Sequence, residues 1–215
     1  MSARSPTGAT EAKMSVRNSL LAILSQGACY GYQLKSEFER RTGGGRRLNV
    51  GQVYATLERL ERDGLVERSD ADPEGRAFFV ATPAGRREAA DWLAGETSNG
   101  EEMLDGLAEK LALALTLVGV DRGRLLDRHR VAVETALAGA RSSRDGVVDP
   151  NETEGLAALV VADARVARLE GVLEWLDRLE VRLRSAADGH APAPLPIHGE
   201  SPRRGRPRKA SSTAA

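Results

Sequence analysis

The chain has 215 residues, 41% of them hydrophobic and 4% aromatic, which is enough for one ordinary domain or two small ones. Its 31 Lys and Arg balance 31 Asp and Glu, and this net charge of zero neither favours nor excludes a nucleic-acid partner. The charge is segregated, however, with −6 over residues 94–190 and +4 over 191–215. The single cysteine, Cys29, excludes an intramolecular disulfide, and no early apolar run is long enough for a membrane span. We therefore expect a cytoplasmic protein with no membrane partner.

The two ends of the chain lack the patterns that build a core. Residues 1–14 mix small polar residues and proline without apolar periodicity, which predicts a disordered arm. Residues 187–215 contain five prolines and almost no large apolar residue, which predicts a disordered basic tail. Between these ends lie two blocks that we expect to be ordered, 15–93 and 94–186.

The first ordered block predicts helices followed by a hairpin. Apolar residues recur on one face of three predicted helices, over 15–25, 31–41 and 49–63. Asn49 is a suitable N-cap for the third helix, and Gly64 is suited to end it. Short extended runs at 65–69 and 77–81 flank a charged loop with Gly and Pro, and Thr82-Pro83 opens a further helix. This order is typical of a winged helix-turn-helix domain.

The second block is helical throughout, with predicted helices over 101–118, 121–140 and 154–185. In the last of these, apolar residues alternate at three- and four-residue steps and form a short heptad seam: Leu169, Val172, Leu176, Leu179 and Leu183. We expect this seam to form a dimer interface; the alternative is packing against 101–118 within the chain. The predicted fold is mainly α with a small β-hairpin wing: an N-terminal winged helix-turn-helix and a C-terminal helical dimerisation domain.

The third predicted helix has the features needed to enter a DNA major groove. Its apolar stripe faces the core, so small and polar residues face outward. Four of them are candidates for contact with base edges: Gln52, Ala55, Thr56 and Arg59. Four further residues are candidates for phosphate contact: Arg46, Arg47, Tyr54 and Arg76. The alternatives are a helix whose charges only keep it soluble, or a winged domain that binds protein.

Three separated motifs resemble the PadR-type transcriptional regulators. Their recognition-helix signature is matched by Asn49, Gly51, Val53, Tyr54, Leu57, Leu60, Asp63, Gly64, Leu65 and Val66. Gly31-Tyr32-Gln33-Leu34 is similar to their second-helix motif, and Gly75-Arg76 with Thr82-x-x-Gly85-Arg86 is similar to their wing and the helix after it. The chain departs from the pattern at Tyr30, where His is frequent, and at Ala55-Thr56, where many members have Pro-Ala.

The resemblance implies a homodimeric repressor that reads an inverted-repeat operator in double-stranded DNA. Glu174-Trp175-Leu176-Asp177-Arg178-Leu179 resembles the last helix of the branch with a larger C-terminal domain. Some members hold a small aromatic ligand between their subunits, which implies that Trp92 lines such a pocket. The alternative is that Trp92 only packs in the core.

The basic tail contains a second candidate DNA element. Residues 202–209 resemble an AT-hook, with the core Arg204-Gly205-Arg206-Pro207. Gly205 lets the backbone lie flat in a narrow minor groove, and the two arginines project into its negative potential. The alternative is a tail that attracts DNA without specificity.

Residue patterns for catalysis or metal binding are missing from the sequence. Three His and one Cys give no zinc-ligand spacing, and there is no phosphate-binding loop or nucleophile elbow. We therefore expect no enzyme activity, no cofactor and no metal, and instead a sequence-specific, nucleoid-associated transcriptional regulator, a dimeric repressor released by a small ligand. The alternatives are an architectural binder of A·T-rich DNA that uses the tail, and a winged-helix protein-interaction module.

Overall fold

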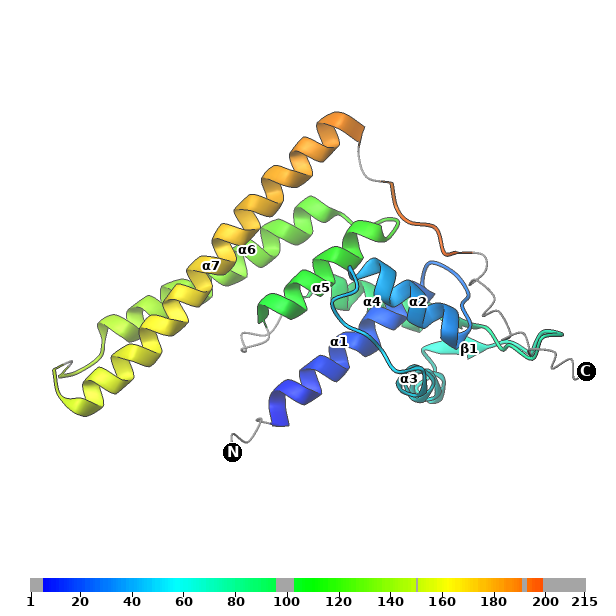
Figure 1. Ribbon diagram of the computed structural model, residues 1–215, viewed down its shortest axis with the longest axis horizontal. Coiled ribbons are helices and arrows are strands. Elements are labelled where there is room, and N and C mark those ends of the chain that lie inside the picture. The colour runs from blue at the N-terminus through cyan, green and yellow to red at the C-terminus, as the bar shows by residue number, and fades with distance from the viewer. Residues whose placement is uncertain (1–5, 96–102, 150, 191–192, 199–215) are drawn as a thin grey trace, which may run out of the picture.

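The computed structural model describes residues 6–95, 103–149, 151–190 and 193–198 (Figure 1). The N-terminal part contains α1 (Pro6–Leu24), α2 (Gly31–Arg41), α3 (Val50–Arg62), β1 (Val66–Arg68), β2 (Phe79–Ala81) and α4 (Pro83–Ala94). The C-terminal part contains α5 (Met103–Thr116), α6 (Arg122–Asp145) and α7 (Thr153–His190). The predicted fold class, mainly helical with a small hairpin, is confirmed.

The boundaries of the winged part follow from local capping. Asn49 caps α3, with its Oδ1 accepting a hydrogen bond of 2.8 Å from the Gly51 amide. Gly64 follows α3 with φ of +71°, a conformation that favours glycine. The two strands pair antiparallel, with Val66 opposite Ala81. Thr82 caps α4 by accepting a hydrogen bond of 3.1 Å from the Gly85 amide.

One hydrophobic core joins the winged part to the first helix of the C-terminal part. It gathers buried side chains from α1, α2, α3, the hairpin and α4, and Leu113 and Leu117 at the end of α5 complete it. The predicted boundary between residues 93 and 94 therefore does not separate two independent cores. Cys29 is fully buried here, and burial together with nearby Glu37 raises the pKa of its thiol to about 12.

A second hydrophobic core is formed by α5, α6 and α7. It buries the apolar seam of the last helix, which the sequence predicted to be an exposed dimer interface. Leu169, Val172 and Leu176 are at most 3% exposed and pack with residues of α5 and α6. Leu179 and Leu183 are half-buried against the same core. Because α6 and α7 form an antiparallel hairpin, the stripe expected to face a second subunit is covered within its own chain.

Both ends of the described chain are more ordered than the sequence predicts. Helix α1 begins at Pro6, so residues 6–14 are helical where a disordered arm was expected. Residues 187–190 continue α7, and residues 193–198 pack against α2 and α5, which corrects the predicted tail over those positions. The residues similar to an AT-hook, 204–207, lie outside the described residues.

His129 of α6 is a buried histidine that makes the stability of the fold depend on pH. Its side chain is 2% exposed, and among the described residues Nε2 has no hydrogen-bond partner. Burial lowers its pKa to about 4, helped by the positive charges of Lys110 and Arg128. Between pH 6.5 and pH 4, His129 therefore binds a proton in the unfolded chain but stays neutral in the folded chain.

We expect the free energy of unfolding to fall as the pH is lowered from 6.5 to 4, because the unfolded state binds more protons there. His129 alone contributes a slope of at most about 1.4 kcal/mol per pH unit. Denaturant unfolding of the wild type and of His129→Leu at a series of pH values checks this. The variant should lose part of the slope between pH 6.5 and 4, and equal slopes in both proteins would contradict the assignment.

Candidate nucleic-acid interface

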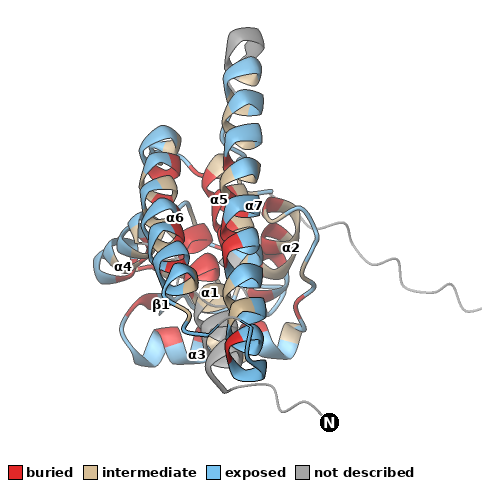
Figure 2. Cartoon of the chain, turned by 90° about the vertical axis from the view of Figure 1, so that its left-hand side faces the viewer, coloured by how far each residue is buried: buried red, intermediate tan, exposed pale blue. Residues whose placement is uncertain are grey.

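Helix α3 presents a polar face on the side of the molecule opposite the C-terminal end of α7 (Figures 1 and 2). Val53, Leu57 and Leu60 are buried at 1% exposure or less. The four residues predicted to face bases lie on the other side: Gln52 and Arg59 are exposed, and Ala55 and Thr56 are half-buried. The predicted orientation of the recognition helix therefore holds in the structure.

Local hydrogen bonds hold the front of this face. Gln52 Oε1 accepts a long hydrogen bond of 3.4 Å from the Asn49 amide, which leaves the two side-chain N–H donors of Gln52 out of the capping interaction. The Thr56 hydroxyl donates to the Gln52 carbonyl at 2.8 Å, so its proton is used within the helix and its oxygen can still act as an acceptor. Among the described residues, the Arg59 side chain makes no ion pair or hydrogen bond. An amide and a guanidinium on one exposed helix face suit adenine and guanine edges.

Tyr54 owes its position to a missing side chain on α2. A Cβ atom at Gly31 would lie 2.5 Å from Tyr54 Cζ, so the ring rests directly against the first residue of α2. Tyr54 is 42% exposed in this position. This contact gives a physical reason for pairing glycine in the second helix with tyrosine in the third.

The predicted phosphate contacts differ in availability. Arg47 is exposed beside the start of α3. Arg46 instead turns toward α5, where its Nε lies 3.7 Å from Glu109 Oε2. Burial raises the pKa of Glu109, and Arg46 partly opposes this effect. Arg46 is thus already an internal partner of a carboxylate.

The wing also holds its arginine internally. Arg76 Nε lies 2.7 Å from Asp72 Oδ2, and its NH2 lies 2.9 Å from Glu74 Oε2. The Arg76 guanidinium lies 5.3 Å from the centroid of the Tyr30 ring. Arg68, which the sequence analysis did not single out, lies exposed on β1 over the Phe79 ring. A phosphate contact by Arg76 therefore competes with these carboxylates for the guanidinium.

A cavity of about 390 Å³ lies between the winged part and α6. Its apolar wall comes from α1, α4, α6 and the connection between α5 and α6, including Ala22, Ala89, Leu93, Leu117, Val120 and Leu125. Three arginines also line it: Arg86, Arg124 and Arg128. Trp92 does not line this cavity. Lys110 Nζ lies 5.0 Å from the centroid of the Trp92 ring and donates to the Gly95 carbonyl at 2.7 Å.

Comparison with known proteins identifies the family. Residues 20–91 match the profile of the Transcriptional regulator PadR-like family. Transcriptional regulator Rv3488 of Mycobacterium tuberculosis is 34% identical over 102 residues, which cover 44% of this chain and 92% of that protein. The chain belongs to the PadR-like family of transcriptional regulators. The resemblance inferred from the motifs is thereby confirmed, and the chain is a regulator of transcription rather than an enzyme.

Further relatives of this PadR-like chain match over greater lengths with lower similarity. Probable transcriptional regulator Rv1176c of Mycobacterium tuberculosis is 23% identical over 80% of this chain and 98% of that protein. The structure of Bacillus subtilis PadR in complex with operator DNA has 18% identity and a TM-score of 0.38, covering 76% of this chain and 96% of that one. The same protein in complex with p-coumaric acid has a TM-score of 0.35, covering 82% and 96%.

The described ranges also bear on membrane spans and metal sites. No helix in residues 6–95, 103–149 or 151–190 has both the length and the apolar character needed to cross a membrane. Across the same described positions and 193–198, no group of three or more His, Cys, Asp and Glu residues is arranged to hold a metal ion.

Proposed function

We propose that this PadR-like regulator is a repressor that binds operator DNA by inserting α3 into the major groove. The observation that supports this most strongly is that α3 is buried on one face only. Val53, Leu57 and Leu60 lie in the core, and Gln52 and Arg59 are both exposed to solvent on the other face. Helices with such a face read base edges when their amide and guanidinium groups form paired hydrogen bonds.

The roles of the individual residues follow from their surroundings. We assign base contacts to Gln52 and Arg59, with Ala55 and Thr56 beside them as apolar and hydroxyl contacts for a thymine methyl or a phosphate. Phosphate contact is placed on Arg47 and Tyr54. For Arg46 and Arg76, phosphate competes with the carboxylates that they already contact.

We expect Arg59→Ala to weaken binding to the operator by about 5- to 150-fold, the usual value of one paired base contact. Fluorescence anisotropy of the full-length chain on a labelled duplex from upstream of its own gene measures this. Arg62→Ala is the matched control, because Arg62 is also an exposed arginine on α3 but is its last residue, three positions farther from Gln52 than Arg59 is. A scrambled duplex of equal composition is the competitor, at two salt concentrations.

The outcomes separate the proposed function from its alternatives. Displacement by operator but not by scrambled DNA supports specific reading. Equal displacement by both indicates the architectural alternative, in which the basic tail dominates. Absence of binding at low salt leaves the protein-interaction alternative. If Arg59→Ala weakens operator and scrambled DNA equally, Arg59 is a phosphate contact instead.

The repressor is proposed to act as a homodimer on an inverted repeat, with one α3 in each half-site about one helical turn apart. Because the predicted seam is buried, the proposed interface moves to the N-terminal half of α7. This half carries Leu156, Val160 and Val161 at 53–71% exposure. The proposed place of action is the cytoplasm, at the nucleoid.

The cavity between α1, α4 and α6 is the proposed site of a small effector. Its apolar walls suit an aromatic ring, and Arg86, Arg124 and Arg128 suit an anionic substituent. A ligand here contacts the winged part and α6 together, so it biases their relative position. Repeating the DNA titration with added benzoate or cinnamate tests this assignment, with release of DNA as the supporting result.

A further inference from the structure

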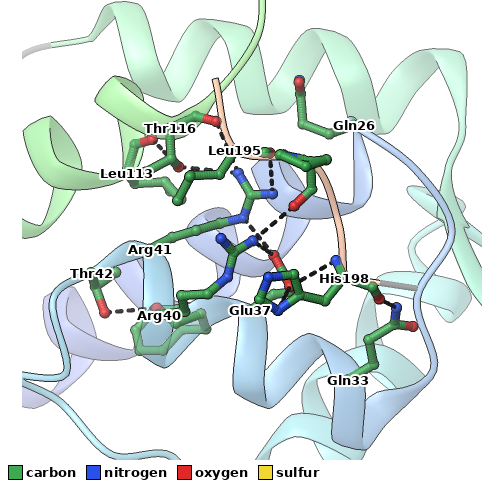
Figure 3. Close-up of polar contacts among 12 residues, drawn as sticks. Gln26, Gln33, Glu37, Arg40, Arg41, Thr42, Leu113, Thr116, Leu195 and His198 are labelled. Atoms are coloured by element: carbon green, nitrogen blue, oxygen red, sulfur yellow. Dashed lines mark hydrogen bonds and ion pairs between the residues drawn. The ribbon is translucent and has the colours of Figure 1, made fainter. Parts of the chain in front are cut away.

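Residues 193–198 form an extended segment that is held through its backbone. Leu195 donates to the Thr116 carbonyl at 3.0 Å, and its own carbonyl accepts from Arg41 NH2 at 2.8 Å (Figure 3). The Pro196 carbonyl accepts from Arg40 NH2 at 2.8 Å. The His198 amide donates to Glu37 Oε1 at 3.1 Å, and its carbonyl accepts from Gln33 Nε2 at 2.6 Å. The segment thus makes five hydrogen bonds to α2 and to the end of α5.

The receiving surface is a buried ion pair. The Arg41 side chain is 0% exposed and the Glu37 side chain 2%, and Arg41 Nε lies 2.9 Å from Glu37 Oε2. Arg41 NH1 donates to the carbonyl and hydroxyl oxygens of Thr116 at 3.0 and 3.1 Å. The remaining capacity of each ion, Arg41 NH2 and Glu37 Oε1, is used by residues 195 and 198. Buried charges are stable only with complete partners, so the docked segment completes this site.

The pKa of the Glu37 carboxyl group also depends on the docked segment. Burial by itself raises its pKa, but hydrogen bonds from Arg40, from the His198 amide and from Arg41 hold the pKa below its ordinary value. One of the three donors that keep this buried carboxylate charged therefore belongs to the segment.

The sequence of the segment suits this mode of binding. Pro194 and Pro196 favour an extended backbone and have no N–H that would need a partner. Ile197 supplies the apolar contact: it packs against the first core, and a Cβ atom at Gly27 would lie 3.0 Å from Ile197 Cδ1. Main-chain hydrogen bonds with one apolar anchor are a common way to recognise an extended peptide.

We propose that the surface formed by Gln33, Glu37, Arg40 and Arg41 is a binding site for an extended proline-containing peptide, filled by residues 193–198 of the same chain, and that this docking tethers the basic residues 203–209 to the DNA-binding part. The tether deepens the proposed function and rests on it. Helix α7 ends on the side of the molecule away from α3, and the docked segment returns the chain to α2 (Figure 1).

The number of residues between the anchor and the basic tail determines how much docking raises the concentration of the tail at the DNA. From His198, residues 199–202 separate the anchor from Arg203, which limits Arg203 to roughly 18 Å from the anchor. Without docking, residues 191–202 form the connection, three times as many. Effective concentration falls as about the −3/2 power of linker length, so release lowers the concentration of the tail at the DNA about fivefold.

Hydrogen exchange of the full-length chain tests the docking without DNA. The Leu195 and His198 amides should exchange more slowly than in an unstructured peptide, and Ile197→Asp, which puts a carboxylate in place of the half-buried apolar anchor, should abolish this protection. Ala193→Asp is the control, because it adds the same charge at an exposed position that makes no hydrogen bond to the described residues of α2. Exchange at the unstructured rate in the wild type overturns the proposed docking.

Anisotropy on the operator duplex at low salt tests the tether. Ile197→Asp should weaken binding about fivefold in the wild-type chain but leave it unchanged when the five basic residues of the tail are replaced by glutamine. An equal effect in both backgrounds, or no effect in either, overturns the tether. If the wild-type chain binds no DNA, the proposed function and the tether fall together, whereas protected Leu195 and His198 amides would still establish the peptide site.

Discussion

Gly85→Ala is expected to destabilise the winged part by on the order of 4 kcal/mol or more, because the new methyl group meets backbone rather than side chain. A Cβ atom at Gly85 would lie 2.0 Å from the Leu65 carbonyl oxygen and 3.1 Å from Leu21 Cδ1. The Leu65 carbonyl has no freedom to retreat, since it accepts the Thr82 amide at 3.0 Å. The close approach therefore joins the turn after α3 to the first turn of α4.

Thermal unfolding followed by circular dichroism checks this prediction. A loss of this size lowers Tm by about 8–16 °C in a chain of this length. Gly139→Ala is the matched control, because Gly139 is exposed in α6 and an added methyl group there would meet no other described part of the chain beyond its own helix backbone and sequence neighbours. Its alanine should stabilise the helix by about 0.5–1 kcal/mol. Equal Tm values for the two variants would show that the contact at Gly85 relaxes without cost.

The winged part was predictable because its signals are local. The stripe of α3, its Asn49 cap and the Gly64 stop each depend on neighbouring residues, and the structure places all three as expected. The Thr82 cap of α4 was predictable for the same reason. The close contact between Gly85 and Leu65 joins residues 20 positions apart, so the sequence showed only a glycine within a motif.

The C-terminal part was less predictable because α7 carries apolar residues on more than one face. The seam from Leu169 to Leu183 has the period of a helix interface, but that period does not say which helix covers it. In the structure α6 and α5 cover it, and the exposed apolar residues of α7 lie elsewhere. Burial of the seam depends on α7 running back along α6, and the heptad pattern carries no information about that arrangement.

In the candidate site, too, the local features were predictable and the contacts between distant residues were not. The face of α3 follows from periodicity, but the pairing of Arg46 with Glu109 depends on how α5 packs. Composition also misled the prediction for residues 193–198, because two prolines and a short apolar run were read as a tail without a core. The buried pair that receives this segment, Glu37 and Arg41, has the spacing of an ordinary surface pair on a helix.

Val160→Asp is expected to weaken the proposed dimer at least about 100-fold, because a carboxylate would be buried in an apolar interface at a cost of about 3 kcal/mol. Val160 is 62% exposed in the single chain, and Val161 beside it is 71% exposed. From Leu156 to Ala167 the outward residues of α7 are mostly small or apolar, over about 17 Å of helix. Such a stripe is better covered than left in water.

The charges at the two ends of this stripe favour a second copy of the chain as the cover. Glu152 and Glu154 precede the stripe, and Arg165 and Arg168 lie at its other end, all of them exposed. When two copies of α7 cross antiparallel about a twofold axis, the acidic end of each stripe meets the basic end of the other. The same surface is then complementary to itself, as a symmetric dimer interface must be.

Sedimentation velocity at micromolar concentration distinguishes this interface from other surfaces of α7. Val181→Asp is the matched control: Val181 is a similarly exposed valine at 60%, about 30 Å farther along the helix and beyond the exposed Glu174–Arg178 pair. The wild type and Val181→Asp should sediment as dimers and Val160→Asp as a monomer with unchanged circular dichroism. Operator binding should fall with the loss of the dimer, since each half-site then binds alone. A dimer that survives Val160→Asp would place the subunit contact outside the N-terminal half of α7.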